Sequence, residues 1–153
     1  MTPSGQEKRL IVAAQRARTK AYAPYSQFRV GAAILTEGGL VFTGCNVENA
    51  TYGATLCAER SAVAAMVTAG QRAPVACAVV TGASPPAAPC GICRQVLFEF
   101  APNLVVILAA VDERGRVTAR HTNRTTLSAL FPQGFSLAAG GGDRPQTSGR
   151  SPR

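Results

Sequence analysis

Three cysteines in two short segments constrain this chain more than any other feature. The first segment is CAER at residues 57–60, and the second is PCGICRQ at residues 89–95. Cys90 and Cys93 are three residues apart, so both sulfurs project from one face of the first turn of a helix that starts near Pro89. The positive end of such a helix favours the thiolate form, which binds metal ions. If Cys57 supplies a third sulfur, the fold has to bring together two segments about thirty residues apart.

This donor set predicts a catalytic zinc site with one Zn²⁺ per chain. Three protein ligands leave the fourth tetrahedral position free for water, whose pKa the metal lowers from about 16 to about 7. Glu59, two residues after Cys57, is well placed to handle the protons of that water. Two alternatives remain open at this point: a redox C-x-x-C pair, and a structural zinc site closed by Cys45, Cys77 or His121.

Length and composition indicate one globular domain. The chain has 153 residues, of which 46% are hydrophobic, and we assign residues 1–139 to a single catalytic domain. Residues 140–153 are rich in Gly, Ser, Pro and Arg, which predicts a disordered basic tail. No run approaches the roughly twenty apolar residues of a membrane span. Five cysteines, an odd number, fit reduced thiols and a cytoplasmic protein.

The formal net charge of +8 does not indicate nucleic-acid binding, because of where the charge lies. Residues 1–20 carry a net +4 and residues 140–153 a net +2, which leaves +2 for the 119 residues between them. A site for a polyanion should be lined by basic side chains. We therefore expect no nucleic-acid partner, although a basic zinc-containing nucleic-acid-binding module remains the non-enzyme alternative.

Hydrophobic periodicity predicts an α/β fold with the order α-β-β-α-β-α-β-β-α. This order implies a three-layer α-β-α sandwich around a five-stranded mixed sheet, in which the second and third helices can bring their N-termini together. The expected helices cover residues 6–21, 57–69, 90–100 and 126–130, and the expected strands cover residues 29–35, 40–46, 75–81, 104–111 and 116–121.

Four motifs stand between about residues 10 and 135: PYSQFRVGAA at 24–33, GCNVENATY at 44–52, CAER at 57–60 and PCGICRQ at 89–95. With these motifs, this stretch of the chain resembles the small homotetrameric cytidine deaminases of nucleoside salvage. The resemblance implies hydrolytic deamination of cytidine and 2′-deoxycytidine at a zinc ion held by Cys57, Cys90 and Cys93, with Glu59 as the general acid and base. A deaminase of another cytosine-bearing nucleoside, such as a nucleoside antibiotic, is the closest alternative.

The resemblance also implies a substrate-binding set and an assembly with shared active sites. Phe28 would stack on the pyrimidine, Ala58 would offer its backbone N–H to the 2-oxygen, and Asn46 and Glu48 would bind the ribose 3′-hydroxyl. Tyr52 and Phe135 would reach the site from neighbouring subunits of a homotetramer. Ala50 completes the implied set.

Arg60 and Arg94 each follow a predicted ligand directly. Three thiolates and one Zn²⁺ sum to −1, which weakens the metal as a Lewis acid. A guanidinium that donates to the sulfurs would offset this charge, so both arginines are expected to support the metal site.

Overall fold

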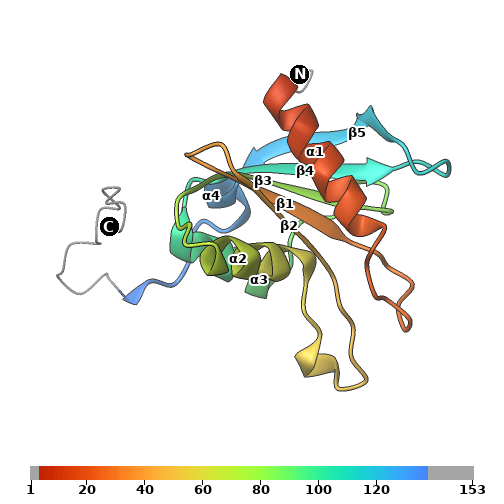
Figure 1. The fold of residues 1–153 in the computed structure, drawn as a ribbon, viewed down its shortest axis with the longest axis horizontal. Helices are drawn as coiled ribbons and strands as arrows, with labels where there is room; N and C mark the ends of the chain where they lie inside the picture. The colour runs from red at the N-terminus through yellow and green to blue at the C-terminus, as the bar shows by residue number, and fades with distance from the viewer. Residues whose placement is uncertain (1–3, 138–153) are drawn as a thin grey trace.

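The structure is a computed structural model that describes residues 4–137 (Figure 1). The predicted basic tail at residues 140–153 lies outside this range. The elements follow in the order α1 (Gly5–Arg18), β1 (Gly31–Thr36), β2 (Val41–Cys45), the 3-10 helix η1 (Tyr52–Ala54), α2 (Ala58–Thr68), β3 (Pro74–Thr81), α3 (Gly91–Phe100), β4 (Val105–Val111), β5 (Val117–Thr126) and α4 (Leu127–Leu130).

The strands form one mixed sheet in the order β2-β1-β3-β4-β5. The β3–β4 pair is parallel, and the β1–β2, β1–β3 and β4–β5 pairs are antiparallel. The predicted α/β fold with a five-stranded mixed sheet packed by helices is therefore confirmed.

Helices cover both faces of the sheet, and alternate residues of each central strand belong to opposite faces. In β1, Ala33 and Leu35 pack in the cluster that contains Leu10 and Ala14 of α1. Their neighbours in the strand pack in the second cluster, with α2, α3 and Leu127 of α4. All six residues of β1 are buried, because the strand is covered on both sides.

Topology explains why α2 and α3 begin side by side. β2 and β3 are both antiparallel to β1, so they run in the same direction, and β3 and β4 are parallel neighbours. The segments β2-α2-β3 and β3-α3-β4 are therefore two successive crossover units. The right-handed rule for such units puts both helices on one face, and each helix starts beyond the carboxyl end of the strand before it. Figure 1 shows α2 and α3 next to each other on that face.

Most element boundaries lie within two residues of the sequence-based expectation, and two differ by more. Helix α1 ends at Arg18 rather than Ala21, because the chain turns at Thr19 and Lys20 to bring Tyr22 into a bridge with Val47. Strand β5 runs to Thr126 rather than His121. Its second half is polar and shows no apolar alternation, but it pairs with β4 as far as Val105.

None of the helices within residues 4–137 is long and apolar enough to cross a membrane.

Gly44 of β2 allows α2 to lie unusually close to the sheet. A Cβ atom at Gly44 would lie 2.4 Å from the backbone nitrogen of Ala62 and 2.5 Å from the carbonyl oxygen of Ala58. Both atoms belong to the helix backbone, which cannot move away as a flexible side chain could. The hydroxyl of Ser61 donates to the Cys45 carbonyl oxygen at 3.0 Å and ties the first turn of α2 to the same strand.

We predict that Gly44→Ala lowers the free energy of unfolding by about 1–3 kcal/mol, the usual cost of forcing an extra carbon into a packed interior. Denaturant unfolding measures this change. Gly5→Ala is the matched control, because a Cβ at Gly5 has no atom within 4 Å and Ala is the better helix former. Equal stability of the two variants would contradict the close-approach argument.

Candidate active site

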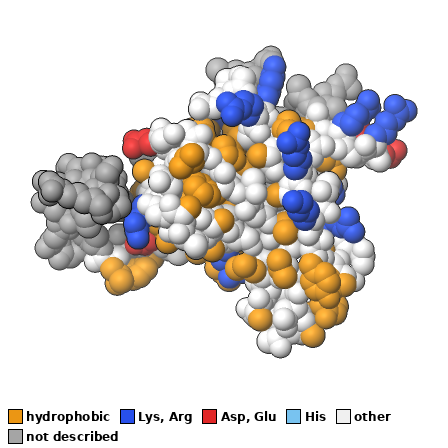
Figure 2. Space-filling view, in the orientation of Figure 1, with side chains coloured by type: hydrophobic (Ala, Val, Ile, Leu, Met, Phe, Trp, Pro, Cys, Tyr) orange, Lys and Arg blue, Asp and Glu red, His pale blue; other side chains and the backbone are white. Residues whose placement is uncertain are grey.

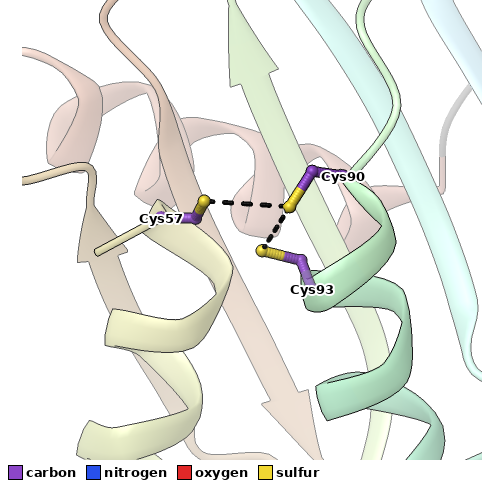
Figure 3. A group of neighbouring side chains, drawn as sticks. All are labelled: Cys57, Cys90 and Cys93. Atoms are coloured by element: carbon purple, nitrogen blue, oxygen red, sulfur yellow. Dashed lines mark hydrogen bonds between the residues drawn. The ribbon is translucent and has the colours of Figure 1, made fainter. Parts of the chain in front are cut away.

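The three cysteines of the sequence motif meet at the starts of α2 and α3 (Figure 3). Cys57 is the N-cap residue of α2, Cys90 is the N-cap residue of α3, and Cys93 lies in the first turn of α3. The Sγ atoms of Cys57 and Cys90 are 3.9 Å apart, and those of Cys90 and Cys93 are 3.5 Å apart. Neither N-cap sulfur makes a capping hydrogen bond to the backbone of its own helix, so both sulfurs are available to a common ligand.

These sulfurs fit a zinc ion. All three Sγ atoms lie within 4.8 Å of one another. A tetrahedral zinc ion with Zn–S bonds of about 2.3 Å holds its sulfur ligands about 3.8 Å apart, close to the spacing of both measured pairs. The alternative ligands Cys45, Cys77 and His121 are not part of this group. The site therefore has three protein ligands, as the catalytic class of zinc site requires.

Charge around Cys57 favours its thiolate. The pKa of Cys57 is lowered to about 5, first because the Cys93 thiol hydrogen-bonds to it and also because the Arg60 guanidinium lies beside it. The Arg60 guanidinium is 3.8 Å from the Cys57 sulfur and also donates to the Thr55 carbonyl oxygen at 2.7 Å. Arg60 therefore places its positive charge beside the sulfur of a metal ligand.

Glu59 is a buried carboxylic acid next to the sulfurs, with only 4% of its surface exposed. Burial raises its pKa, and the negative charge of Cys57 adds to the rise. Its place in the first turn of α2 has the opposite tendency, because the N-terminus of a helix favours a carboxylate. A carboxyl group with a raised pKa takes up a proton more readily than an exposed one, which suits a general acid and base.

A cavity of about 270 Å³ is lined by Cys57, Cys90 and Glu59. Its walls also include four of the implied substrate-binding residues, which are Phe28, Asn46, Glu48 and Ala58. The Phe28 ring is 41% exposed, so it is available to a ligand rather than enclosed in the core.

Asn46 and Glu48 also hold the loop that carries Phe28. The side-chain oxygen of Asn46 accepts from the backbone N–H of Val30 at 2.8 Å, and its nitrogen donates to the Phe28 carbonyl oxygen at 2.9 Å. The Glu48 carboxylate accepts from the backbone N–H groups of Tyr25 and Ser26 and from the Ser26 hydroxyl. Each side chain keeps further hydrogen-bonding capacity for a ligand.

Three implied substrate-binding residues lie outside this cavity. Tyr52 is 78% exposed on η1, where its ring packs edge-on against Tyr25 and lines an adjacent hollow. Ala50 is exposed in the preceding bend. Phe135 is 67% exposed in the segment after α4. Within a single chain, none of the three side chains lines the cavity wall beside the sulfurs.

The contacts of Arg94 differ from the expectation for it. Its guanidinium donates to the carbonyl oxygens of Pro89 and Leu130, each at 2.8 Å. These bonds hold the loop before α3 to the end of α4, rather than neutralising a sulfur. Residue spacing could not show this, because Leu130 is 36 residues away in the chain.

Sequence reasoning also missed several residues of the cavity wall. They are Ser26, Val30, Thr55, Val79, Thr81, Ala87 and Ala88. Small and apolar side chains carry no chemical signature. Ser26 and Val30 lie within the motif at residues 24–33, which was the one available signal.

The family of the chain follows from sequence comparison. Residues 4–109 match the family described as "Cytidine and deoxycytidylate deaminase zinc-binding region". The chain is 41% identical over 129 residues to a cytidine deaminase of Sporosarcina psychrophila, covering 84% of this chain and 90% of the relative. It is 49% identical over 124 residues to a cytidine deaminase of Mycobacterium tuberculosis, covering 81% and 85%.

Solved structures agree with this assignment. The crystal structure of cytidine deaminase from Burkholderia pseudomallei superposes with a TM-score of 0.77 at 46% identity, covering 88% of this chain and all of that one. The M. tuberculosis enzyme superposes with a TM-score of 0.69 at 41% identity, covering 85% and 97%. The chain belongs to the cytidine and deoxycytidylate deaminase zinc-binding family, and its zinc ligands are Cys57, Cys90 and Cys93.

We predict that Cys90→Ala lowers the zinc content well below one ion per chain and destabilises the domain, since metal binding and folding are thermodynamically linked. Metal analysis and thermal unfolding of the purified protein measure both effects. Cys45→Ala is the control, because Cys45 is a free cysteine outside the sulfur group. One zinc per chain in the Cys90 variant would contradict the ligand assignment.

Proposed function

We infer that this chain is a zinc-dependent cytidine deaminase, which hydrolyses cytidine and 2′-deoxycytidine to the uridines and releases ammonia. The observation that carries the inference is the meeting of three cysteine sulfurs and a buried Glu59 beside one cavity, in a chain of this family. When bound by these cysteines, zinc acidifies a water molecule.

The cavity has an apolar end suited to a pyrimidine ring. Phe28 offers a ring face, and Val30 and Val79 line the same hollow. Ala58 is the first residue of α2, and the N–H groups of a first helical turn have no partner within the helix. This N–H is therefore suited to the 2-oxygen of the base, with carbon 4 of the ring directed toward the sulfurs.

Glu59 moves the protons of the reaction. It takes a proton from the attacking water and delivers it to ring nitrogen N3, which makes carbon 4 more electrophilic as the new C–O bond forms. It then takes the proton of the new 4-hydroxyl group and passes it to the 4-amino group, so that the C4 carbonyl forms as the C–N bond breaks and ammonia leaves. Water and cytidine enter, uridine and ammonia leave, and Glu59 returns to its starting state.

The sugar side of the site supports a plain nucleoside as substrate. Asn46 and Glu48 line the cavity, and each side chain has hydrogen-bonding capacity that its contacts within the chain do not use. Both are therefore suited to the ribose 3′-hydroxyl. Glu48 carries a lowered pKa, chiefly because the Ser26 hydroxyl bonds to it, so it is an anionic acceptor at neutral pH. The negative charge of Glu48 disfavours a phosphate group on the sugar at this end of the site.

We also propose that the chain assembles as a homotetramer with shared active sites, in the cytoplasm. The exposed positions of Tyr52 and Phe135 support sharing, because both side chains are accessible to a partner subunit. Five free cysteines support a reducing compartment. Sedimentation equilibrium tests the assembly, and a fully active monomer would argue against it.

The assignment as an enzyme is tested by incubating the purified protein with cytidine and following the ultraviolet change to uridine. Activity should disappear after the metal is removed by a chelator and return when zinc is added. A zinc-loaded protein that leaves cytidine unchanged but deaminates another cytosine nucleoside would shift the substrate assignment to that compound.

We predict that Glu59→Gln retains zinc and fold but lowers kcat by a factor of at least about 10², the usual scale for loss of general acid–base catalysis. Gln keeps the size of the side chain but cannot accept the proton. Steady-state kinetics with parallel metal analysis measure the effect, and Glu99→Gln on exposed α3 surface is the matched control. Near-normal turnover in the Glu59 variant would remove Glu59 from the mechanism.

A further inference from the structure

Helix α3 holds the last residue of α4 and the segment after it through four successive contacts. Arg94 donates to the Leu130 carbonyl oxygen, and the ring of Phe98 packs edge-on against Phe131 with their centroids 5.9 Å apart. Gly134 lies directly on the Phe98 ring, since a Cβ there would be 2.6 Å from a ring carbon. The fourth contact is made by Gln95.

Gln95 binds both backbone groups of Phe135. Its side-chain nitrogen donates to the Phe135 carbonyl oxygen at 2.8 Å, and its side-chain oxygen accepts from the Phe135 N–H at 3.0 Å. A primary amide that pairs with both groups of one residue fixes the orientation of that residue's backbone as a neighbouring strand would. Phe135 itself lies outside the helices and strands of the described residues.

Burial does not place Phe135, because its side chain is 67% exposed and Leu137 after it is 88% exposed. The backbone of Phe135 is therefore held by its two hydrogen bonds to Gln95 rather than by burial of its side chain. The residue that makes them is two positions after the zinc ligand Cys93.

We propose that Gln95 is a positioning residue, which fixes the backbone of Phe135 and thereby the direction in which its ring is presented to a neighbouring subunit's active site. This inference rests on the proposed function, in which Phe135 approaches the substrate of a neighbour. Helix α3 then serves two sites: its first turn binds zinc in its own subunit, and its second turn orients an aromatic side chain for the next.

The test compares Gln95→Ala, Phe135→Ala and the double variant in the full-length, zinc-loaded enzyme. We expect Gln95→Ala and Phe135→Ala each to raise KM for cytidine about tenfold, the scale of one lost aromatic–base contact, with kcat within about twofold. The double variant should match Phe135→Ala alone, because Gln95 acts through Phe135. Gln95→Glu keeps the acceptor but not the donor, so its KM should fall between those of wild type and Gln95→Ala.

A second measurement tests the hydrogen bonds between Gln95 and Phe135 without any activity assay. Amide hydrogen exchange at Phe135 should be faster in Gln95→Ala, because the N–H loses its acceptor, and unchanged in Glu99→Ala, the matched control on the exposed side of the same helix. Zinc content should stay at one ion per chain in every variant.

Three results would overturn the inference: a wild-type KM in Gln95→Ala, additive effects in the double variant, or unchanged exchange at Phe135 in Gln95→Ala. The failure of the proposed function is distinct, because it appears as a wild-type enzyme without activity on cytidine. In that case the exchange measurement still decides whether Gln95 holds the segment.

Discussion

The site depends on the N-termini of two helices, which meet beyond the carboxyl ends of β2 and β3. Cys57 and Cys90 occupy equivalent N-cap positions in α2 and α3, and their sulfurs are 3.9 Å apart. This meeting requires that β2 and β3 run in the same direction and that both crossovers lie on one face. It also requires the glycine at residue 44, because a side chain there would keep α2 away from the sheet.

Electrostatics impose a second requirement on the same few residues. Three thiolates exceed the charge of one Zn²⁺, so a cation near the sulfurs strengthens the metal as a Lewis acid. Arg60 provides that cation from the first turn of α2, and its bond to the Thr55 carbonyl oxygen holds it in place. Arg94 follows a ligand in the same way but serves the backbone of α4 instead. Equivalent spacing therefore does not imply equivalent function.

The segments around the metal site combine structural and ligand-facing roles. Asn46 lines the cavity and also forms hydrogen bonds to the backbone on both sides of Arg29. It therefore holds Phe28 and Val30, two other residues of the cavity wall, in place. Glu48 similarly anchors the loop at residues 25 and 26. A single-residue change at either position therefore affects both the loop and any ligand. On the face drawn in Figure 2, Lys and Arg side chains lie mostly over the upper and right-hand parts of the molecule and line no groove seen in that view.

The sequence by itself determined the metal donors and the order of elements. Local rules suffice for these: cysteines three apart share a helical face, proline opens a helix, and apolar periodicity separates strands from helices. The tertiary structure decided what depends on distant contacts. Examples are the continuation of β5 to Thr126 along β4, the hydrogen bond from Arg94 to Leu130, and the hydrogen bonds between Gln95 and Phe135. Each partner lies at least 20 residues away along the chain, where spacing carries no information and only the packing of the folded chain sets the distance.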